Sequence, residues 1–223
     1  MKIMDYPDAE MMSLELAQRI AGELTATLEH EERALLVVPG GTTPGQIFDV
    51  LCAARLPWER VDIALSDERW RPEEHVRSNT RLVRQRLMVE RAAAATFLPL
   101  YARAATPEEV LPELESNLVG RLPISVMLLG MGTDLHVASL FPGADNIALA
   151  MRHDAPLLVP MRVPSEPEPR VTMSARVLDG ALSKHLVITG EAKRAALERA
   201  AGMTREQAPV SAVLDGMQVH WAP

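Results

Sequence analysis

Residues 34–44 read ALLVVPGGTTP, and this stretch predicts the fold class of the chain. It opens with an unbroken apolar run, which is typical of a parallel strand whose two faces are both buried. A glycine pair ends that strand, and Thr43 followed by Pro44 is suited to begin a helix, with threonine as the N-cap and proline at the first helical position. A buried strand that leads straight into a helix is the first half of a βαβ unit.

Strands and helices alternate along the rest of the chain in the same way. Apolar residues recur at helical spacing over residues 14–28, so a helix is expected before the first buried strand. Further buried strands are predicted at residues 61–65, 125–129, 157–159, 171–173 and 185–189. Later helices are predicted from near Ser78, from the capping box at Thr106 to about residue 120, and over residues 191–200. This alternation indicates an α/β fold with a largely parallel sheet.

Two later segments depart from the alternation. The Asp215-Gly216 pair separates the apolar stretches 210–214 and 217–221, which is the signal for a two-residue β-hairpin, so we expect an antiparallel C-terminal edge of the sheet. Between residues 156 and 170, several prolines predict a surface loop, because proline fixes φ and lacks a backbone N–H donor. That loop is either an ordinary connection or a hinge or lid.

Composition excludes several classes of partner. The 223 residues are 48% hydrophobic and 24% charged, which fits a globular chain, and we expect residues 1–223 to form a single domain. Lysine and arginine number 23 against 30 aspartate and glutamate. The resulting net charge of −7 argues against nucleic acid or an anionic membrane as a partner, but it leaves room for a local cationic pocket.

Cysteine usage and hydropathy bear on the location of the protein. Cys52 is the only cysteine, so no intramolecular disulfide and no thiolate metal cluster can form. No apolar run approaches the ~18 residues needed to cross a bilayer, and the first residues lack the apolar core of a signal peptide. We therefore expect a cytoplasmic protein, either a monomer or a homodimer.

The first loop with potential for chemistry is Gly40-Gly41-Thr42-Thr43-Pro44. Ligands of parallel α/β sheets bind beyond the carboxyl ends of the strands, where this loop is expected. The two glycines admit a ligand close to the backbone, and the N-terminus of the following helix favours an anion. No lysine follows in the place that a Walker motif requires. Phosphate binding and a purely structural glycine turn both fit this pattern.

The second loop follows the strand at residues 61–65 and is rich in arginine. Its cationic side chains, within nine residues of an otherwise acidic chain, are Arg69, Arg71, His75 and Arg77. Because a guanidinium offers paired donors that match phosphate oxygens, this cluster is a candidate local source of positive charge. The alternative is a solvated surface run whose charges compensate one another.

The third loop spans residues 130–143 and reads GMGTDLHVASLFPG. It begins like a dinucleotide-binding fingerprint, but Leu135 stands where the third glycine should be. What remains is Asp134 with His136, in which a carboxylate can orient an imidazole. A catalytic pair and an ordinary structural histidine are both open here. The histidines lack metal-binding spacing and Ser139 lacks the Gly-x-Ser-x-Gly elbow, so we expect neither a metal site nor a serine acyl-enzyme.

Taken in order, these segments resemble the lactonases of the glucosamine-6-phosphate isomerase/6-phosphogluconolactonase family. The resemblance covers residues 37 to about 196 and rests on PGGTTP at 39–44, SDERW at 66–70 with SN at 78–79, and LGMGTDLHVASLFPG at 129–143. The segments PRVT at 169–172 and GEAK at 190–193 are similar to later motifs of the family. Each motif is modest alone, but their order and spacing are specific.

The resemblance implies a three-layer αβα sandwich with a mostly parallel sheet, as in sugar-phosphate isomerases and deaminases. It implies a carboxylic ester hydrolase that converts 6-phospho-D-glucono-1,5-lactone to 6-phosphogluconate in the oxidative pentose phosphate pathway, with a small sugar phosphate as partner and no cofactor. His136 would act as general base on the attacking water, and Asp134 would orient it. The groups that would bind the sugar phosphate are Gly40, Gly41, Thr42, Thr43, Asp67, Arg69, Asn79, Arg170 and Lys193. Of these, Asp67 and Asn79 would bind sugar hydroxyls and the rest the phosphate.

Two other functions stay open: a glucosamine-6-phosphate deaminase or related sugar-phosphate isomerase, and a sugar-phosphate-binding regulator. Glucosamine-6-phosphate deaminases share a Gly-x-Gly-x-Asp-Gly-His segment, and with that function Asp67 would be the base that removes a carbon-bound proton. The deaminases usually continue through Phe-Asn-Glu-Pro, whereas this chain reads ASLFP at residues 138–142, which favours the lactonase. A sugar-phosphate-binding regulator on the same fold is the non-enzyme alternative, although no output module such as a helix-turn-helix is evident.

Two residues depart from the pattern of the family. Glycine usually separates the aspartate from the histidine and threonine usually follows the histidine, but this chain has Leu135 and Val137. If the glycine position needs a positive φ, leucine costs about 1–2 kcal/mol there or the loop is reshaped. Val137 lacks the hydroxyl that threonine would offer to a substrate.

Overall fold

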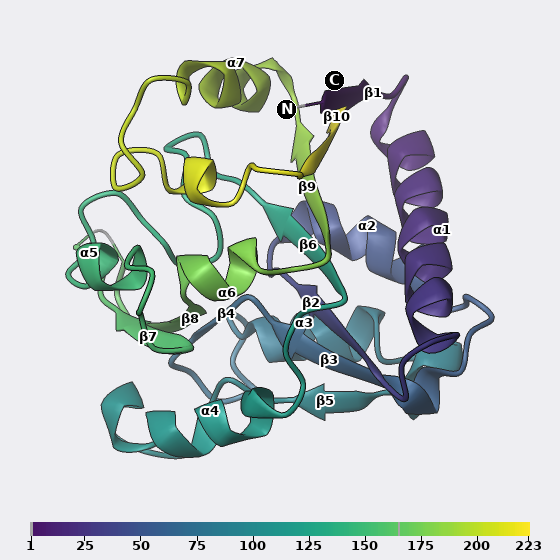
Figure 1. Cartoon of the computed structure of the whole chain (residues 1–223), viewed down its shortest axis with the longest axis horizontal. Coiled ribbons are helices and arrows are strands. Elements are labelled where there is room, and N and C mark those ends of the chain that lie inside the picture. The colour runs from purple at the N-terminus through teal and green to yellow at the C-terminus, as the bar shows by residue number, and fades with distance from the viewer. Residues whose placement is uncertain (1, 165) are drawn as a thin grey trace.

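A seven-stranded sheet crosses the computed structural model, which describes residues 2–164 and 166–223 (Figure 1). The strand order is β1-β10-β9-β6-β2-β3-β5, and each neighbouring pair is parallel. The strands are β1 (Lys2–Asp5), β2 (Ala34–Val38), β3 (Val61–Leu65), β5 (Thr96–Leu98), β6 (Val126–Gly130), β9 (Ser183–Thr189) and β10 (Gln218–Ala222). The prediction of an α/β fold with a mostly parallel sheet is confirmed.

Helices lie on both sides of this sheet (Figure 1). On one side, α1 (Ala9–Leu28) contacts β10, β2 and β6 and packs on α2 (Thr42–Leu51), which contacts α3 (Asn79–Arg86). On the other side lie α4 (Leu111–Val119), α5 (Ile147–Ala150) and α6 (Ala175–Asp179). The last helix, α7 (Glu191–Arg199), contacts β9. Short 3-10 helices cover Trp58–Arg60, Glu90–Ala94, Pro107–Glu109 and Pro209–Ala212.

A small antiparallel sheet accompanies α4 to α6. Its order is β4-β8-β7, formed by β4 (Asp67–Arg69), β7 (Leu158–Met161) and β8 (Arg170–Met173). β4 follows β3 after a single residue, so this second sheet begins at the carboxyl end of the central one. The antiparallel register sets Thr172 opposite Asp67 at the start of β4 and Arg170 opposite Arg69 at its end, and the Met173 N–H donates to the Ser66 carbonyl just after β3.

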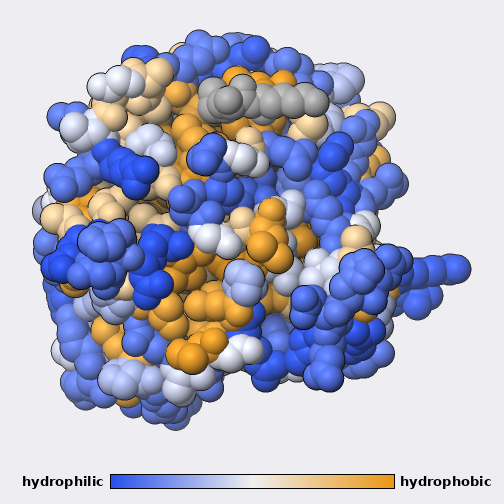
Figure 2. Space-filling view, viewed as in Figure 1, coloured by the Kyte–Doolittle hydropathy of each residue, from blue (hydrophilic) through white to orange (hydrophobic). Residues whose placement is uncertain are grey.

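The strands in the middle of the large sheet are buried because helices or the small sheet cover both of their faces. Each residue of β2 and β3 is buried, as their apolar runs predict. Figure 2 shows hydrophilic side chains around the rim of one face of the molecule and apolar side chains in its middle. No helix in the described part of the chain is long and apolar enough to cross a membrane.

Capping side chains set helix starts where the sequence predicts them. The Ser78 hydroxyl accepts a hydrogen bond from the backbone N–H of Arg81 at 3.2 Å and so caps α3. The capping box of Thr106 and Glu109 is present, with the Thr106 backbone N–H donating to the Glu109 carboxylate at 3.1 Å. It begins a 3-10 turn that precedes α4, where the sequence predicts one continuous helix.

The prediction of Thr43 as an N-cap is wrong. The N-cap of α2 is Gly41, which makes no side-chain hydrogen bond, and the helix begins at Thr42. Pro44 therefore occupies the third helical position rather than the first. That position tolerates proline because the first backbone N–H groups of a helix have no partner within it.

The predicted C-terminal hairpin is also wrong, since β10 runs parallel to both of its neighbours, β9 and β1. The turn itself exists, with the Met217 N–H donating to the Leu214 carbonyl at 3.1 Å. The stretch before it forms the 3-10 helix Pro209–Ala212 instead of a strand, and the Val210 N–H donates to the Leu135 carbonyl at 3.1 Å. That contact joins segments far apart in the sequence, so no local pattern reveals it.

The proline-rich stretch 156–170 contains β7 and leads into β8, and Ser165 within it lies outside the described residues. Its carboxylates are tied to the arginine-rich loop. Glu166 pairs with Arg77 at 2.7 Å, and the buried Glu168 pairs with Arg77 at 2.9 Å. The described part of this stretch is thus attached to the loop between β4 and α3, and a role as hinge or lid stays a prediction.

A chain of hydrogen bonds crosses the core from β1 toward α1. The Tyr6 hydroxyl lies 2.9 Å from His220 Nδ1, His220 Nε2 lies 3.0 Å from His185 Nδ1, and His185 Nε2 lies 2.7 Å from Glu23 Oε2. One proton arrangement satisfies every link, with each group donating to the next toward Glu23. Burial alone would raise the pKa of Glu23, but the hydrogen bonds from His185 and Ser183 outweigh it and lower that pKa.

This buried chain predicts a loss of stability at acidic pH. Burial, with repulsion from His185 and Arg19, lowers the pKa of His220 to about 3, against about 6.5 in an unfolded chain. Between these values the unfolded chain binds a proton that the folded chain excludes. The free energy of unfolding therefore falls as pH falls, by up to about 1.4 kcal/mol per pH unit from this residue. Urea unfolding between about pH 4 and 7 should show a shallower dependence for His220→Asn; equal slopes would contradict the prediction.

Candidate active site

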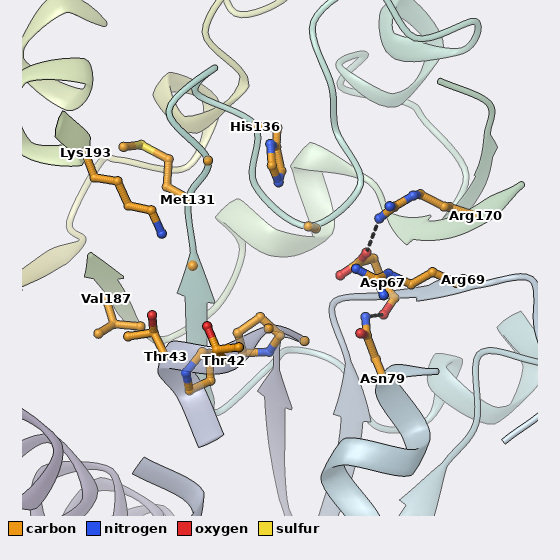
Figure 3. Close-up of a pocket in the computed structure, with 17 residues that line it drawn as sticks. Thr42, Thr43, Asp67, Arg69, Asn79, Met131, His136, Arg170, Val187 and Lys193 are labelled. Carbon is orange, nitrogen blue, oxygen red and sulfur yellow. Dashed lines mark hydrogen bonds and ion pairs between the residues drawn. The ribbon is translucent and has the colours of Figure 1, made fainter. Parts of the chain in front are cut away.

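The carboxyl ends of β2, β6 and β9 open into a cavity of about 250 Å³ (Figure 3). Its walls are Pro39, Gly40, Gly41, Thr42, Thr43, Pro44, Asp67, Arg69, Asn79, Gly130, Met131, Gly132, His136, Ala138, Arg170, Val187 and Lys193. This is the edge at which parallel α/β sheets bind their ligands. The three loops predicted to carry chemistry meet here.

The cavity is lined by all of the site residues predicted from the sequence except Asp134, which hydrogen-bonds to His136 instead. These residues come from several structural elements. Asp67 and Arg69 lie on β4, Asn79 opens α3, Arg170 opens β8 and Lys193 lies in the first turn of α7. The parallel topology brings these positions to one edge of the sheet.

A hydrogen bond to Asp134 fixes the tautomer of His136. Its Nδ1 lies 2.6 Å from Asp134 Oδ1, and the hydrogen bond lowers the pKa of the Asp134 carboxyl although partial burial opposes it. The ionised Asp134 is an acceptor only, so Nδ1 is the donor in this bond, and in the tautomer that the bond favours Nε2 is the acceptor nitrogen. In Figure 3 the ring of His136 points into the cavity between the residues on its two sides. This arrangement suits a general base.

The loop that carries His136 folds back on itself through hydrogen bonds between residues that are close in the sequence. The Gly132 N–H donates to the His136 carbonyl at 3.1 Å, and the Leu135 N–H donates to the Gly132 carbonyl at 3.0 Å. A Cβ on Gly132 would overlap the Asp134 carboxylate and the His136 ring, so only glycine fits there. Leu135 adopts φ = 70°, which shows that the loop keeps the left-handed conformation and accepts the strain of a leucine.

The strain at Leu135 can be measured by comparing two truncations. Leu135 is 4% exposed, so Leu135→Ala and Leu135→Gly both lose a buried side chain, at a cost of about 2–5 kcal/mol. Only glycine also relieves the positive φ, which contributes about 1–2 kcal/mol. We expect the glycine variant to be more stable than the alanine variant by about 1 kcal/mol in urea unfolding. An alanine variant of equal or greater stability would show that the loop is not strained.

On one side of His136 the cavity wall consists of polar side chains linked by hydrogen bonds. Asp67 accepts a hydrogen bond from the Ser139 hydroxyl at 2.5 Å and lies 3.7 Å from Arg170 Nη1. Arg170, whose side chain is 5% exposed, also pairs with Glu166 at 2.7 Å. Arg69 donates to the backbone carbonyl of Arg77 at 2.7 Å. The charge of Arg170 is therefore compensated by two carboxylates, whereas Arg69 is bonded to a neutral group.

The arginine cluster divides into two kinds of residue. Arg77 pairs with Glu166 and Glu168, and Arg71 approaches Glu168 at 3.7 Å, so these two arginines compensate carboxylates outside the cavity. Arg69 alone of the cluster lines the cavity. The surface-run interpretation thus fits Arg71 and Arg77, and the interpretation as a local cation source fits Arg69.

A buried carboxylate that sequence reasoning missed holds the start of α3. Glu68 accepts hydrogen bonds from the backbone N–H groups of Asn79 at 2.8 Å and Thr80 at 2.7 Å, and from that of Arg69 at 2.8 Å. Burial raises its pKa although these hydrogen bonds oppose the shift. The hydrogen bond from Asn79 to Glu68 holds Asn79 close to Gly40, where a Cβ would overlap the Asn79 amide. No sequence signal pairs Glu68 with a helix that begins eleven positions later.

On the other side of His136 lie Lys193 and the N-terminus of α2 (Figure 3). Burial lowers the pKa of the half-buried Lys193. Thr42 and Thr43 form the first turn of α2, whose unpaired backbone N–H groups attract an anion. The cavity therefore carries positive groups on both sides of the imidazole. Its apolar walls, Met131, Ala138 and Val187, were missed because aliphatic residues carry no chemical signal in a sequence.

Comparisons with known proteins find relatives in both sequence and structure. The family model described as glucosamine-6-phosphate isomerases/6-phosphogluconolactonase matches residues 7–221. A 6-phosphogluconolactonase from Pseudomonas aeruginosa is 41% identical over 212 residues, which cover 93% of this chain and 89% of the relative. A 6-phosphogluconolactonase from Mesorhizobium japonicum is 37% identical over 98% of this chain and 94% of its own length. The crystal structure of a 6-phosphogluconolactonase from Shewanella baltica superposes with a TM-score of 0.95 at 30% identity, covering 99% of this chain and 97% of that one.

Proposed function

This chain belongs to the glucosamine-6-phosphate isomerase/6-phosphogluconolactonase family, and we propose that it hydrolyses 6-phospho-D-glucono-1,5-lactone to 6-phosphogluconate with water activated by His136. This chain matches curated 6-phosphogluconolactonases over nearly their whole length. The match confirms the predicted enzyme class, a carboxylic ester hydrolase of the pentose phosphate pathway. The observation that carries the mechanism is the His136 ring, whose Nδ1 is bonded to Asp134 and which points into a cavity with positive groups on both sides.

The proposed reaction begins with a water molecule between His136 Nε2 and the lactone C1. The imidazole takes a proton from this water as its oxygen attacks the C1 carbonyl, and Asp134 stabilises the imidazolium that forms. Collapse of the tetrahedral intermediate breaks the ring C1–O bond, and the proton passes to the leaving ring oxygen. General-base help of this kind contributes typically ~10²–10⁴-fold, which suffices for a reactive ester. The scheme uses no cofactor.

Charge compensation indicates which cations bind the phosphate. The Arg170 charge is already balanced by Asp67 and Glu166, whereas Arg69 is bonded only to a carbonyl. Lys193 forms no ion pair with the described residues. We therefore assign the phosphate to Lys193, Arg69 and the α2 N-terminus, with Arg170 fixing the wall beside them. The phosphate-facing loop residues are Gly40, Gly41, Thr42 and Thr43, and Asp67 with Asn79 faces the sugar hydroxyls.

Two assays on one preparation test the function against its alternatives. The proposal predicts acid release from freshly made 6-phosphogluconolactone above the spontaneous rate, and no ammonia release from glucosamine 6-phosphate. The reverse pattern would favour a deaminase with Asp67 as the carbon-proton base. Calorimetric binding of 6-phosphogluconate without turnover of the lactone would favour a sugar-phosphate-binding regulator.

Composition and enzyme class support proposals for the location and the partners of the protein. We propose a cytoplasmic location, because the single thiol, Cys52, is buried and unpaired and the substrate is an intracellular metabolite. The net charge of −7 disfavours nucleic acid and anionic membranes as partners. A monomer or a homodimer is proposed, and sedimentation analysis distinguishes the two.

A further inference from the structure

We propose that Phe141 is a positioning residue, whose ring fixes the plane of the His136 imidazole and at the same time supports Arg170. The inference rests on the proposed lactonase function, because it concerns how the base of that reaction is aimed. Phe141 is not among the residues that line the cavity. Its effect on the reaction would pass entirely through the two residues that it contacts.

One hydrogen bond is not enough to aim the imidazole. The bond between His136 Nδ1 and Asp134 fixes a point on the ring, but the ring can still turn about that point. The Asp134 side chain is 52% exposed, and solvent-exposed pairs of this kind constrain geometry weakly. A second contact must determine the direction of Nε2.

The ring of Phe141 supplies that second contact. Its centroid lies 4.0 Å from the centroid of the His136 ring, and the two planes meet at 22°, which is a parallel stack. Phe141 is 8% exposed and belongs to the hydrophobic core, so the surface on which His136 lies is rigid. With Nδ1 held at one edge and the plane held by the stack, the direction of Nε2 is determined.

The backbone of the loop brings Phe141 under the histidine. Ala138 adopts φ = 50°, and the Leu140 N–H donates to the Val137 carbonyl at 2.9 Å, so the chain reverses direction just after His136. Val137 also bridges to Met131 at the end of β6, which anchors the turn to the central sheet. The reversal returns the chain so that the ring of Phe141 faces the imidazole.

The same ring also supports the other side of the site. The guanidinium carbon of Arg170 lies 5.1 Å from the Phe141 centroid, within the range of a cation–π contact. Arg170 in turn donates to Ser139 at 3.3 Å, and Ser139 donates to Asp67. One aromatic ring thus sets the distance between the proposed base and the polar wall that faces the sugar.

The test compares a substitution that removes the ring with one that keeps it. Phe141→Met preserves an apolar side chain of similar volume but offers no plane, and we expect kcat to fall by about 10–100-fold and KM to rise by a smaller factor, because small misplacements of a base are costly. Phe141→Tyr keeps the ring and should retain kcat within about threefold. The upfield NMR shift that the stacked ring imposes on the His136 ring protons should be present in the wild type and the Tyr variant and lost in the Met variant.

A matched control variant, and the same substitution made in a His136→Ala protein, separate a positioning role from a general loss of structure. Phe97 also lies beneath an arginine, with the guanidinium carbon of Arg84 at 5.0 Å from its centroid, but it is outside the cavity. Phe97→Met should leave kcat unchanged. If Phe141 acts on kcat through His136, Phe141→Met should add little to the loss of kcat in a His136→Ala background.

The outcomes distinguish the inference from the function on which it rests. A wild type that hydrolyses the lactone, together with a folded Phe141→Met variant of unchanged kcat and unchanged His136 shifts, would overturn the role of Phe141 alone. A wild type without lactonase activity would overturn the proposed function, and the NMR shifts would still report whether Phe141 holds the imidazole.

Discussion

Replacing His136 by alanine is expected to lower kcat for lactone hydrolysis at least about a hundredfold while leaving the fold nearly intact. The rate falls because no other group takes the proton from the attacking water in the proposed mechanism. The fold survives because the His136 side chain is 30% exposed and lies in a loop, so little core packing is lost. Steady-state kinetics and a thermal melt of the same preparation measure the two effects.

A control histidine makes this result specific. His153 is exposed and lies outside the cavity, so His153→Ala should leave kcat and KM unchanged. If His136→Ala is folded and hydrolyses the lactone at the wild-type rate, the general-base role is wrong and the water must be activated by another group.

Replacing Arg69 by alanine is expected to raise KM for the phosphorylated lactone by about 10–100-fold with a small change in kcat. A charge-assisted hydrogen bond to phosphate contributes about 1.5–3 kcal/mol, and the phosphate does not change during the reaction, so the loss is shared by ground state and transition state. Measuring kcat and KM separately distinguishes this binding role from a role in the chemical step.

The unphosphorylated lactone tests whether Arg69 acts on the phosphate, because this substrate has none. Glucono-1,5-lactone lacks the phosphate, so its kcat/KM should be low in the wild type and little changed by Arg69→Ala. Arg71→Ala is the matched control, because Arg71 approaches Glu168 and does not line the cavity. An equal loss of kcat/KM on both lactones would show that Arg69 acts on the ring or the carbonyl and not on the phosphate.

The parts of the fold that could be predicted depend on neighbouring residues. β2 and β3 occupy the predicted ranges because a strand buried on both faces must be apolar throughout, which a sequence displays directly. The cap at Ser78 is likewise local. The three loops line one cavity because each follows a parallel strand, and the carboxyl ends of such strands lie at one edge.

The parts that could not be predicted depend on contacts between distant segments. β10 lies between β9 and β1 and runs parallel to both, a pairing of distant segments that the Asp215-Gly216 turn does not reveal. Glu68 looks like one member of a charged run, yet it is buried at the start of α3. The stack of Phe141 on His136 depends on two left-handed residues in one loop. At Leu135 the sequence allowed either a strained backbone or a reshaped loop, and the positive φ in the structure decides for the strained backbone.

The most direct test of the account is the initial rate of acid release from freshly made 6-phosphogluconolactone at constant pH, with the spontaneous rate subtracted. We predict that the full chain shows saturable turnover in the ordinary enzymatic range of about 1–10³ s⁻¹, at least about a hundredfold above that of His136→Ala. A wild-type rate equal to the spontaneous rate, or equal rates for the two proteins, would contradict it.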